Sequence, residues 1–559
     1  MRQKPLLRGA ACIFCFLLVP ACNNLQNESS HDDSLVKASK KVSFSYSAQN
    51  SVYEVGEDTV SVQLTGDLSG KHLYLVKANP TDGVIASDRV RYVTALNNVP
   101  LTGSSQASAR SVSSKRFFDD DIITYFDPPQ VFDPAEAVPS AARSAVAAAG
   151  GEEAVSAKTF AVGDTRQLYV DANAAISAFE QKTAVLKAVG EYCYVWVVDV
   201  ERNRAAELYA GEFQRQFDDM YRMITHVYGQ ESNQIYVYNG KNFSLDDMSK
   251  YSLTGTKVNI VLSRFVSTGT VGYFYCKDYY SGYTSSASDA RAYSNQGKYV
   301  YINTRYVGLE SDRKMAYSTL AHEFQHLIMF GQKNIRCKAT AADWFNEMMS
   351  MVCEDMMQRT LGVTDAQSPK NRLGRFAASY YLSGASEFIS VDGSHLPSYA
   401  VLYAFGAYLA RTYGGAAFIS KVMQNDYCNE GAIAAAVSEV TGVQTTFAEI
   451  LRAFVLSFVK DGAASLNSQP EESPFFTGMV DSETKYDYPL EPIDMNTILQ
   501  KGSNGIFGMK YFDAGEREIA LRPNGFTLHS LGELSGTSLT VTFNEAGAAG
   551  QRLFLVVAE

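Results

Sequence analysis

Cysteine, tryptophan and positive charge are all scarce in this sequence of 559 residues. It has 8 cysteines and 2 tryptophans, and 60 Asp and Glu outnumber 49 Lys and Arg, which gives a net charge of −11. So acidic a chain is a poor binder of polyphosphates, and this argues against a nucleic-acid-binding protein. The chain can still bury sizeable cores, since 46% of its residues are hydrophobic and only 19% are charged.

The cysteines do not form the paired motifs of a structural zinc site or of a disulfide scaffold. No Cys-x-x-Cys pair occurs after the N-terminal segment, and the chain beyond residue 22 contains an odd number of cysteines. At least one thiol therefore stays free, and the spacing does not reveal which of the others pair. These cysteines are Cys193, Cys276, Cys337, Cys353 and Cys428.

The first 21 residues read as a targeting signal. A basic start precedes a short apolar run at residues 10–21, which is too short to span a bilayer. Cys22 follows Ala21 as in the lipobox of bacterial lipoproteins, although Pro20 is unusual there. The resemblance implies cleavage before Cys22, its lipidation, and an exported protein anchored to the membrane at the cell envelope or cell surface. An ordinary signal peptide with an incidental cysteine is the alternative.

Hydrophobic patterning divides the rest of the chain into β-rich ends and a mixed centre. Residues 22–41 are polar and suit a tether. Period-two alternation predicts an N-terminal β domain at residues 42–103 and a C-terminal one at residues 471–559. A Ser/Ala/Pro-biased linker at residues 104–157 leads to residues 158–470, where strands give way to helices. We expect an α+β protein whose central domain is flanked by two β-sandwich-like domains.

The segment His322-Glu-Phe-Gln-His326 carries the strongest chemical information. Composition alone predicts on the order of 0.005 such matches in a chain of this length. Ser311 and Gly331 suit the start and end of a helix around it. Two histidines four residues apart on a helix lie on one face, about 6 Å apart, as two ligands of one Zn²⁺ ion require. Glu323, beside the first histidine, can accept a proton from a zinc-activated water.

A catalytic zinc site needs a third protein ligand and an open position. The next histidine is His395, too distant for a three-histidine motif, so a carboxylate is expected. Glu347 follows His326 by 21 residues, which leaves room for a turn and an antiparallel second helix. Glu354 shares the face of Glu347 and is the alternative ligand. A carboxylate at Asp343 or at Glu354 otherwise suits a supporting role behind the histidines.

These two helices resemble the gluzincin metallopeptidases. Ala321-His-Glu-Phe-Gln-His-Leu-Ile, followed by Trp344-Phe-Asn-Glu-Met-Met-Ser, is similar to the hyicolysin-like neutral metalloproteases. The likeness extends over roughly residues 160–470. It implies a zincin-like domain, one catalytic Zn²⁺ ion, and Glu347 as the third ligand. Met348 stands where many relatives have glycine, which alters the packing beside that ligand.

A donor to the developing oxyanion completes such a site. Pro397-Ser-Tyr399, followed by Tyr408-Leu409 and Gly414-Gly415, resembles the tyrosine-bearing helix of gluzincin aminopeptidases. The resemblance assigns the donor to Tyr399, with Tyr403 one turn later as its rival and His395 as a further alternative. The tyrosines could equally serve only to pack an amphipathic helix.

The strand predicted at residues 298–304 lies just before the active-site helix. In metallopeptidases of this class the sheet edge above the metal binds the substrate as an added strand. We therefore consider this strand a candidate for that edge, with an ordinary core strand as the equal alternative.

The sequence as a whole predicts an exported, lipid-anchored zinc endopeptidase that hydrolyses protein or peptide substrates. The alternative is a surface lipoprotein whose peptidase domain has degenerated into a binding or adhesion module. Intact Glu323 argues against that alternative, because loss of the general base is the usual route to an inactive remnant. An aminopeptidase is disfavoured, because no Gly-x-Met-Glu-Asn segment precedes His322.

Overall fold

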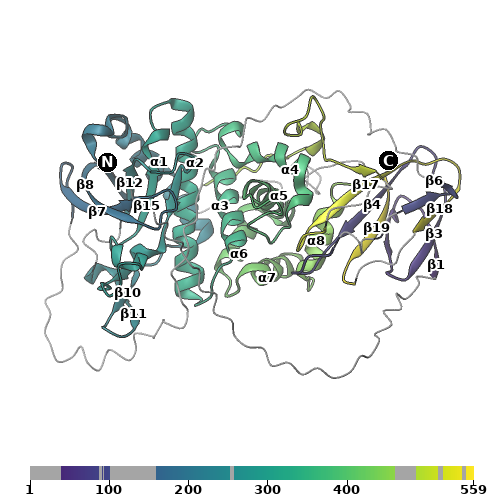
Figure 1. Cartoon of the computed structure of the whole chain (residues 1–559), viewed down its shortest axis with the longest axis horizontal. Helices are drawn as coiled ribbons and strands as arrows, with labels where there is room; N and C mark the ends of the chain where they lie inside the picture. The colour runs from purple at the N-terminus through teal and green to yellow at the C-terminus, as the bar shows by residue number, and fades with distance from the viewer. Residues whose placement is uncertain are drawn as a thin grey trace, which may run out of the picture.

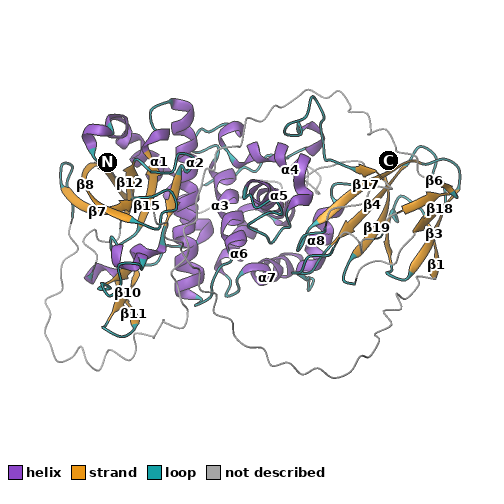
Figure 2. Ribbon diagram, viewed as in Figure 1, coloured by secondary structure: helices purple, strands orange, loops and turns teal. Residues whose placement is uncertain are grey.

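The structure is a computed structural model that describes residues 40–86, 91, 93–100, 159–251, 257–459, 486–513, 520–543 and 549–558. The signal segment, Cys22, the tether and the 104–157 linker lie outside these residues, so the predictions made for them stay predictions. Within the described part, a mixed sheet lies at one end, helices fill the middle and a β-sandwich forms the other end (Figures 1 and 2). The predicted α+β class is confirmed. No helix in the described ranges combines the length and the apolarity needed to cross a membrane.

The mixed sheet has six strands in the order β13-β15-β12-β9-β8-β7. Strands β9, β12 and β15 are parallel, and every residue in them is buried. Such uninterrupted burial is typical of parallel strands covered on both faces. The strand bounds are β7 Thr165–Asp171, β8 Phe179–Val189, β9 Cys193–Val198, β12 Val258–Ser263, β13 Gly272–Phe274 and β15 Tyr299–Asn303. A second, three-stranded sheet contains β10 (Gln234–Tyr238), β11 (Phe243–Asp247) and β14 (Tyr280–Ser281).

Strand β15 is not the edge of its sheet, so the edge predicted at residues 298–304 is wrong. It pairs in parallel with β12 on one side and antiparallel with β13 on the other. Among the described residues, the last strand at this side of the sheet is β13, whose three residues are too few to show a period-two pattern in the sequence. The alternative interpretation of 298–304 as a core strand is the correct one.

Eight α-helices lie in the described ranges. Helix α2 begins one residue before the predicted cap Ser311, with Leu309 as its N-cap. Gly331 does not end it, because a π-helix, η10, continues the chain over Phe330–Arg336. The helices are α1 Arg204–Tyr228, α2 Glu310–Met329, α3 Asp343–Met357, α4 Leu373–Ser379, α5 Leu396–Tyr413, α6 Gly415–Gln424, α7 Asn429–Thr441 and α8 Phe447–Leu456.

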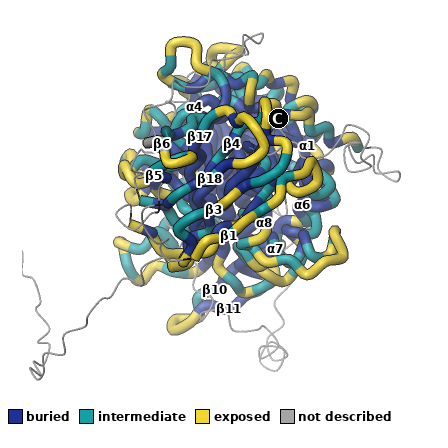
Figure 3. The backbone as a smooth tube through the Cα atoms, turned by 90° about the vertical axis from the view of Figure 1, so that its right-hand side faces the viewer, coloured by how far each residue is buried: buried dark blue, intermediate teal, exposed yellow. Residues whose placement is uncertain are grey.

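Both ends of the chain build one β-sandwich. Its two five-stranded sheets have the orders β1-β3-β18-β5-β6 and β16-β17-β4-β19-β2. Strand β18 from the C-terminal part of the chain pairs between β3 and β5 (Figure 3). Strand β4 from the N-terminal part pairs between β17 and β19 (Figure 1). The strands are β1 Lys40–Ser45, β2 Val52–Val55, β3 Thr59–Thr65, β4 His72–Ala78, β5 Val93–Leu96, β6 Val99–Pro100, β16 Phe512–Asp513, β17 Phe526–Glu533, β18 Ser538–Phe543 and β19 Arg552–Ala558.

The expectation of two separate β domains is therefore wrong. Each end supplies only part of each sheet, and the apolar faces are buried only when the two parts combine. The second sheet is buried on both sides: Leu75 and Leu555 face the sandwich core, whereas Val76 and Phe554 belong to the main core of the protein. Within the described residues, no disulfide bond joins any two of the cysteines Cys193, Cys276, Cys337, Cys353 and Cys428.

Candidate metal centre

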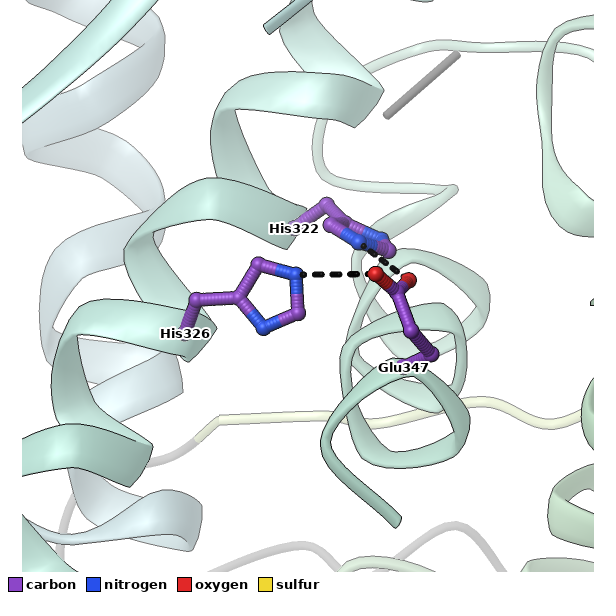
Figure 4. Close-up of side chains that lie close together, drawn as sticks. All are labelled: His322, His326 and Glu347. Atoms are coloured by element: carbon purple, nitrogen blue, oxygen red, sulfur yellow. Dashed lines mark hydrogen bonds and ion pairs between the residues drawn. The ribbon is translucent and has the colours of Figure 1, made fainter. Parts of the chain in front are cut away.

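Two packed helices bring together the three side chains that the sequence predicts as metal ligands. His322 and His326 lie on α2 and face Glu347 on α3 (Figure 4). Nε2 of His322 is 3.1 Å from one carboxylate oxygen of Glu347, and Nε2 of His326 is 3.7 Å from the other. One ligand atom of each residue lies within 4.8 Å of those of the other two, and all three residues are buried.

This donor set fits a zinc ion. With metal–ligand bonds of about 2.0–2.1 Å, tetrahedral geometry puts neighbouring donor atoms about 3.3 Å apart. The separations of 3.1 and 3.7 Å bracket that value. Two imidazole nitrogens and one carboxylate oxygen are also the ligand types of catalytic zinc sites that keep a fourth position open.

The far nitrogen of each imidazole is held by a second residue. Nδ1 of His322 lies 2.9 Å from Oε1 of Glu354, whose other oxygen accepts a hydrogen bond of 2.6 Å from Ser318. Nδ1 of His326 lies 2.9 Å from Oδ1 of Asn346. Donation from Nδ1 fixes the tautomer in which the lone pair of Nε2 faces Glu347. Glu354 therefore supports His322, which is the role that its position in the sequence favours, and it is not the third member of the donor group.

Ser350 adds a contact behind His326. Its hydroxyl lies 3.0 Å from Nδ1 of His326 and donates a hydrogen bond to Gln325. Asp343, the other carboxylate considered for a supporting role, is exposed at the first turn of α3.

Burial keeps the two histidines in the neutral form that binds metals. Desolvation lowers the pKa of His322 well below 6.5, and the positive charge of Arg372 lowers it further. Desolvation also lowers the pKa of His326, and the neighbouring His322 adds to this effect. Neutral imidazoles present their lone pairs without first losing a proton, which favours metal binding at neutral pH.

The candidate general base, Glu323, lies under the edge strand β13. Its side chain is 0% exposed. A Cβ atom added to Gly272 of β13 would come within 3.0 Å of Cγ of Glu323 and 2.7 Å of Cγ2 of Thr319. The absence of a side chain at Gly272 thus allows the edge strand to approach the active-site helix closely.

The first turn of α5 carries the candidate oxyanion donor. The ring of Tyr399 is buried, and the guanidinium carbon of Arg372 lies 5.0 Å from its centroid. The positive charge of Arg372 also lowers the pKa of His322. Tyr403 is placed differently, because its hydroxyl donates a hydrogen bond of 3.0 Å to buried Asp355. This engagement argues against Tyr403 as the donor.

His395 precedes α5 and is half-buried. Its Nδ1 lies 3.0 Å from the carbonyl oxygen of Phe388, and its ring centroid is 6.4 Å from that of Tyr399. His395 is therefore a half-buried neighbour of Tyr399.

Comparison with known proteins identifies the family. Residues 215–497, half of the chain, match peptidase M30. The chain belongs to the peptidase M30 family. It is also 25% identical over 302 residues to the neutral metalloprotease ShpI of Staphylococcus hyicus. That alignment covers 52% of this chain and 61% of the relative, so the chain spans about three-fifths of the relative's length. The expected likeness to hyicolysin-like metallopeptidases is confirmed.

Two elements of this M30 site had no signature in the sequence. Arg372 belongs to a 3-10 helix at Pro369–Arg372, a segment without a recognised motif. Gly272 lies in the three-residue strand β13, and only its packing against α2 gives it a role. A single glycine outside any recognised motif is too common in sequences to have identified it.

Proposed function

We propose that this M30 family protein is a zinc-dependent endopeptidase. The observation that carries the proposal is the buried group of His322, His326 and Glu347, whose ligand atoms lie within 4.8 Å of one another. Each imidazole is also oriented by a partner on Nδ1, as metal-ligating histidines normally are. A pair of histidines that served only for packing would not need a third donor facing both Nε2 atoms.

The residues around the proposed zinc ion have distinct tasks. When bound, zinc lowers the pKa of a coordinated water and polarises a carbonyl group. Glu323 accepts a proton from the attacking water and delivers it to the leaving amine, for which its position next to His322 is suited. Tyr399 donates a hydrogen bond to the oxyanion that develops on the substrate. Glu354 and Asn346 hold the imidazoles in place.

The edge strand β13 is the proposed docking site for the substrate backbone. It is the last strand of its sheet among the described residues, and it lies directly over Glu323. Main-chain hydrogen bonds from such an edge bind an extended peptide with little dependence on its sequence. This arrangement favours an endopeptidase that acts on protein or peptide substrates.

The decisive experiment compares the purified chain with its Glu323→Gln variant on casein and labelled peptides. We expect the variant to lose turnover and to keep about one zinc ion per chain, because Gln cannot accept the proton and is not a ligand. Loss of zinc in the variant would show that Glu323 has another role. If both proteins bind zinc and neither cleaves any substrate, the endopeptidase proposal fails and a degenerate binding domain remains.

The oxyanion donor is tested with matched variants on one helix. We expect Tyr399→Phe to lower kcat by about 10²-fold, the usual effect of removing one oxyanion donor. Tyr403→Phe should lower stability with little effect on kcat, because its hydroxyl contacts Asp355. If His395→Gln shows the large loss and Tyr399→Phe does not, His395 is the donor.

Export and lipid anchoring at Cys22 are proposed from the N-terminal sequence alone. Expression in a bacterial host with radiolabelled fatty acid should label the wild type and not Cys22→Ser. Label retained by Cys22→Ser would refute anchoring at this residue.

A further inference from the structure

A loop of the β-sandwich reaches the helical part of the protein. Residues 521–525 precede β17, and Asn79, which follows β4, holds them in place. The side-chain amide of Asn79 donates to the carbonyl oxygens of Leu521 and Arg522, at 3.3 and 3.0 Å. Its backbone N–H donates to the carbonyl oxygen of Gly525 at 2.9 Å. The N-terminal part of the sandwich therefore fixes the conformation of this C-terminal loop.

The same loop contacts residues 384–387 through a charged pair. Nε of Arg522 donates to Oε2 of Glu387 at 3.0 Å, and Nη2 donates to the other carboxylate oxygen. The two side chains are only 18% and 12% exposed. A two-point contact between a guanidinium and a carboxylate fixes both position and orientation, and low exposure reduces its screening by water.

Backbone contacts strengthen this interaction. The N–H of Ala385 donates to the carbonyl oxygen of Asn524 at 3.0 Å, and the side chain of Asn524 donates to Ser386 at 2.7 Å. A Cβ atom on Gly384 would lie 1.6 Å from the carbonyl oxygen of Pro523. The two backbones are therefore in direct contact, at a place where only glycine fits.

The residues that flank 384–387 hold the start of α5. On one side, Ser383 shares a buried hydrogen bond of 2.9 Å with Ser398. On the other side, the carbonyl oxygen of Phe388 lies 3.0 Å from Nδ1 of His395. The ring of Phe388 packs edge-on against the ring of Tyr399, with the ring centroids 5.8 Å apart. A continuous set of contacts therefore runs from the sandwich to Tyr399.

We propose that the β-sandwich is a positioning element of the active site, which acts on Tyr399 through the Arg522–Glu387 pair. The sandwich thereby sets the distance between the first turn of α5 and the metal ligands on α2 and α3. This inference rests on the proposed function, because it takes Tyr399 as the oxyanion donor. Arg522 and Glu387 are positioning residues and do not touch the substrate.

The test uses the full chain with Arg522→Gln, Glu387→Gln and the double variant. The matched control is Arg552→Gln, which breaks another two-point pair of the same sandwich, with Glu54 at 2.8 Å for both contacts. We expect each single variant to lower kcat about tenfold or more, with KM within about twofold and zinc content unchanged. The double variant should be no worse than the singles, and the control should match the wild type.

Two further measurements distinguish positioning from general destabilisation. In a Tyr399→Phe background, Arg522→Gln should cause no additional loss of kcat, because the group that it positions is already absent. Amide hydrogen exchange of residues 395–403 should become faster in Arg522→Gln, while exchange in α2 stays unchanged. The proposal would be overturned if Arg522→Gln lowered kcat by the same factor in the Tyr399→Phe background as in the wild type. It would also be overturned if Tyr399→Phe were as active as the wild type, or if exchange in Arg522→Gln became faster throughout the chain.

Failure of the proposed function gives a different result. If the wild type binds zinc but cleaves nothing, the endopeptidase reading is wrong, and the exchange pattern alone decides whether the sandwich positions α5. Unchanged exchange at residues 395–403 in Arg522→Gln would then refute the inference.

Discussion

Adding one methyl group at Gly272 tests how the edge strand controls Glu323. The new Cβ atom would lie 2.7 Å from Cγ2 of Thr319, 3.0 Å from Cγ of Glu323 and 3.1 Å from the carbonyl oxygen of Tyr301. Carbon atoms pack at about 3.5–4.0 Å, so β13 and α2 must separate by about 0.8 Å to relieve the closest contact. Overpacking of this kind typically costs about 1–3 kcal/mol of stability.

The catalytic effect of Gly272→Ala should exceed its effect on stability. A displacement of about 1 Å in a catalytic group lowers rates by about 10²-fold, so we expect kcat/KM to fall by about 30- to 100-fold. Zinc content should stay unchanged, since the three atoms nearest to the added Cβ belong to Thr319, Glu323 and Tyr301 and not to a proposed metal ligand. The assay is peptide cleavage at several substrate concentrations, with zinc measured on the same samples.

Gly269→Ala is the matched control for this experiment. It lies in the loop before β13, its added Cβ would meet nothing within 4 Å, and its backbone does not require glycine. We expect it to match the wild type. If Gly272→Ala also cleaves at the wild-type rate, the close approach of β13 to α2 has no influence on Glu323, and the reasoning is refuted.

Three further outcomes follow from the metal centre. Glu354→Gln should weaken zinc binding by about 10- to 100-fold, because the substitution weakens the hydrogen bond to Nδ1 of His322. The control Asp343→Asn should leave zinc affinity unchanged. A competition titration with a zinc chelator measures both affinities. Removal of zinc by a chelator should abolish cleavage, and added Zn²⁺ should restore it; activity that survives in metal-free protein would contradict the proposal. The free energy of unfolding of the metal-free protein should decrease as pH falls below about 6.5. The reason is that His322 and His326 bind protons in the unfolded chain, whereas their lowered pKa values keep them unprotonated in the folded protein. Denaturant melts of the wild type and of His326→Gln between pH 5 and 8 measure that slope, which should be smaller in the variant.

The metal centre could be predicted because its proposed ligands lie close together in the sequence, within residues 322–347. His322 and His326 are one helical turn apart, so a helix alone sets their geometry. Glu347 needed one further assumption, an antiparallel second helix, and the packing of α3 on α2 meets it. Even the support from Glu354 could be anticipated, because it lies on the same face of α3 as Glu347. The role proposed for Tyr399 could not be derived this way, since it depends on how α5 crosses the other helices.

The β-sandwich could not be predicted from the sequence, because its strands pair with strands that lie several hundred residues away along the chain. Alternation identifies β4 and β17 as strands, but nothing in either segment tells which strand pairs with which. Leu528 of β17 pairs with Val76 of β4, a partner separated from it by almost the whole chain. Period-two patterning therefore gave the right kind of element and the wrong domain organisation. Strand β13 could not be predicted for another reason: its three residues are too few to show an alternation of polar and apolar side chains.

The segment of the chain that matches the M30 family is shorter than the folded unit that contains it. The M30 match begins at residue 215, inside α1, and ends at residue 497. A fragment with those bounds would lose β9, the parallel partner of β12 from Cys193 to Val197, and would expose one side of a fully buried strand. It would also lose Arg522, the partner of Glu387. All three proposed metal ligands would remain in such a fragment, but it would lose a partner strand of the central sheet and the contact that we propose positions Tyr399. The strands before residue 215 and the β-sandwich therefore belong to the folded unit around the proposed metal centre, although all three proposed ligands lie inside the M30 match.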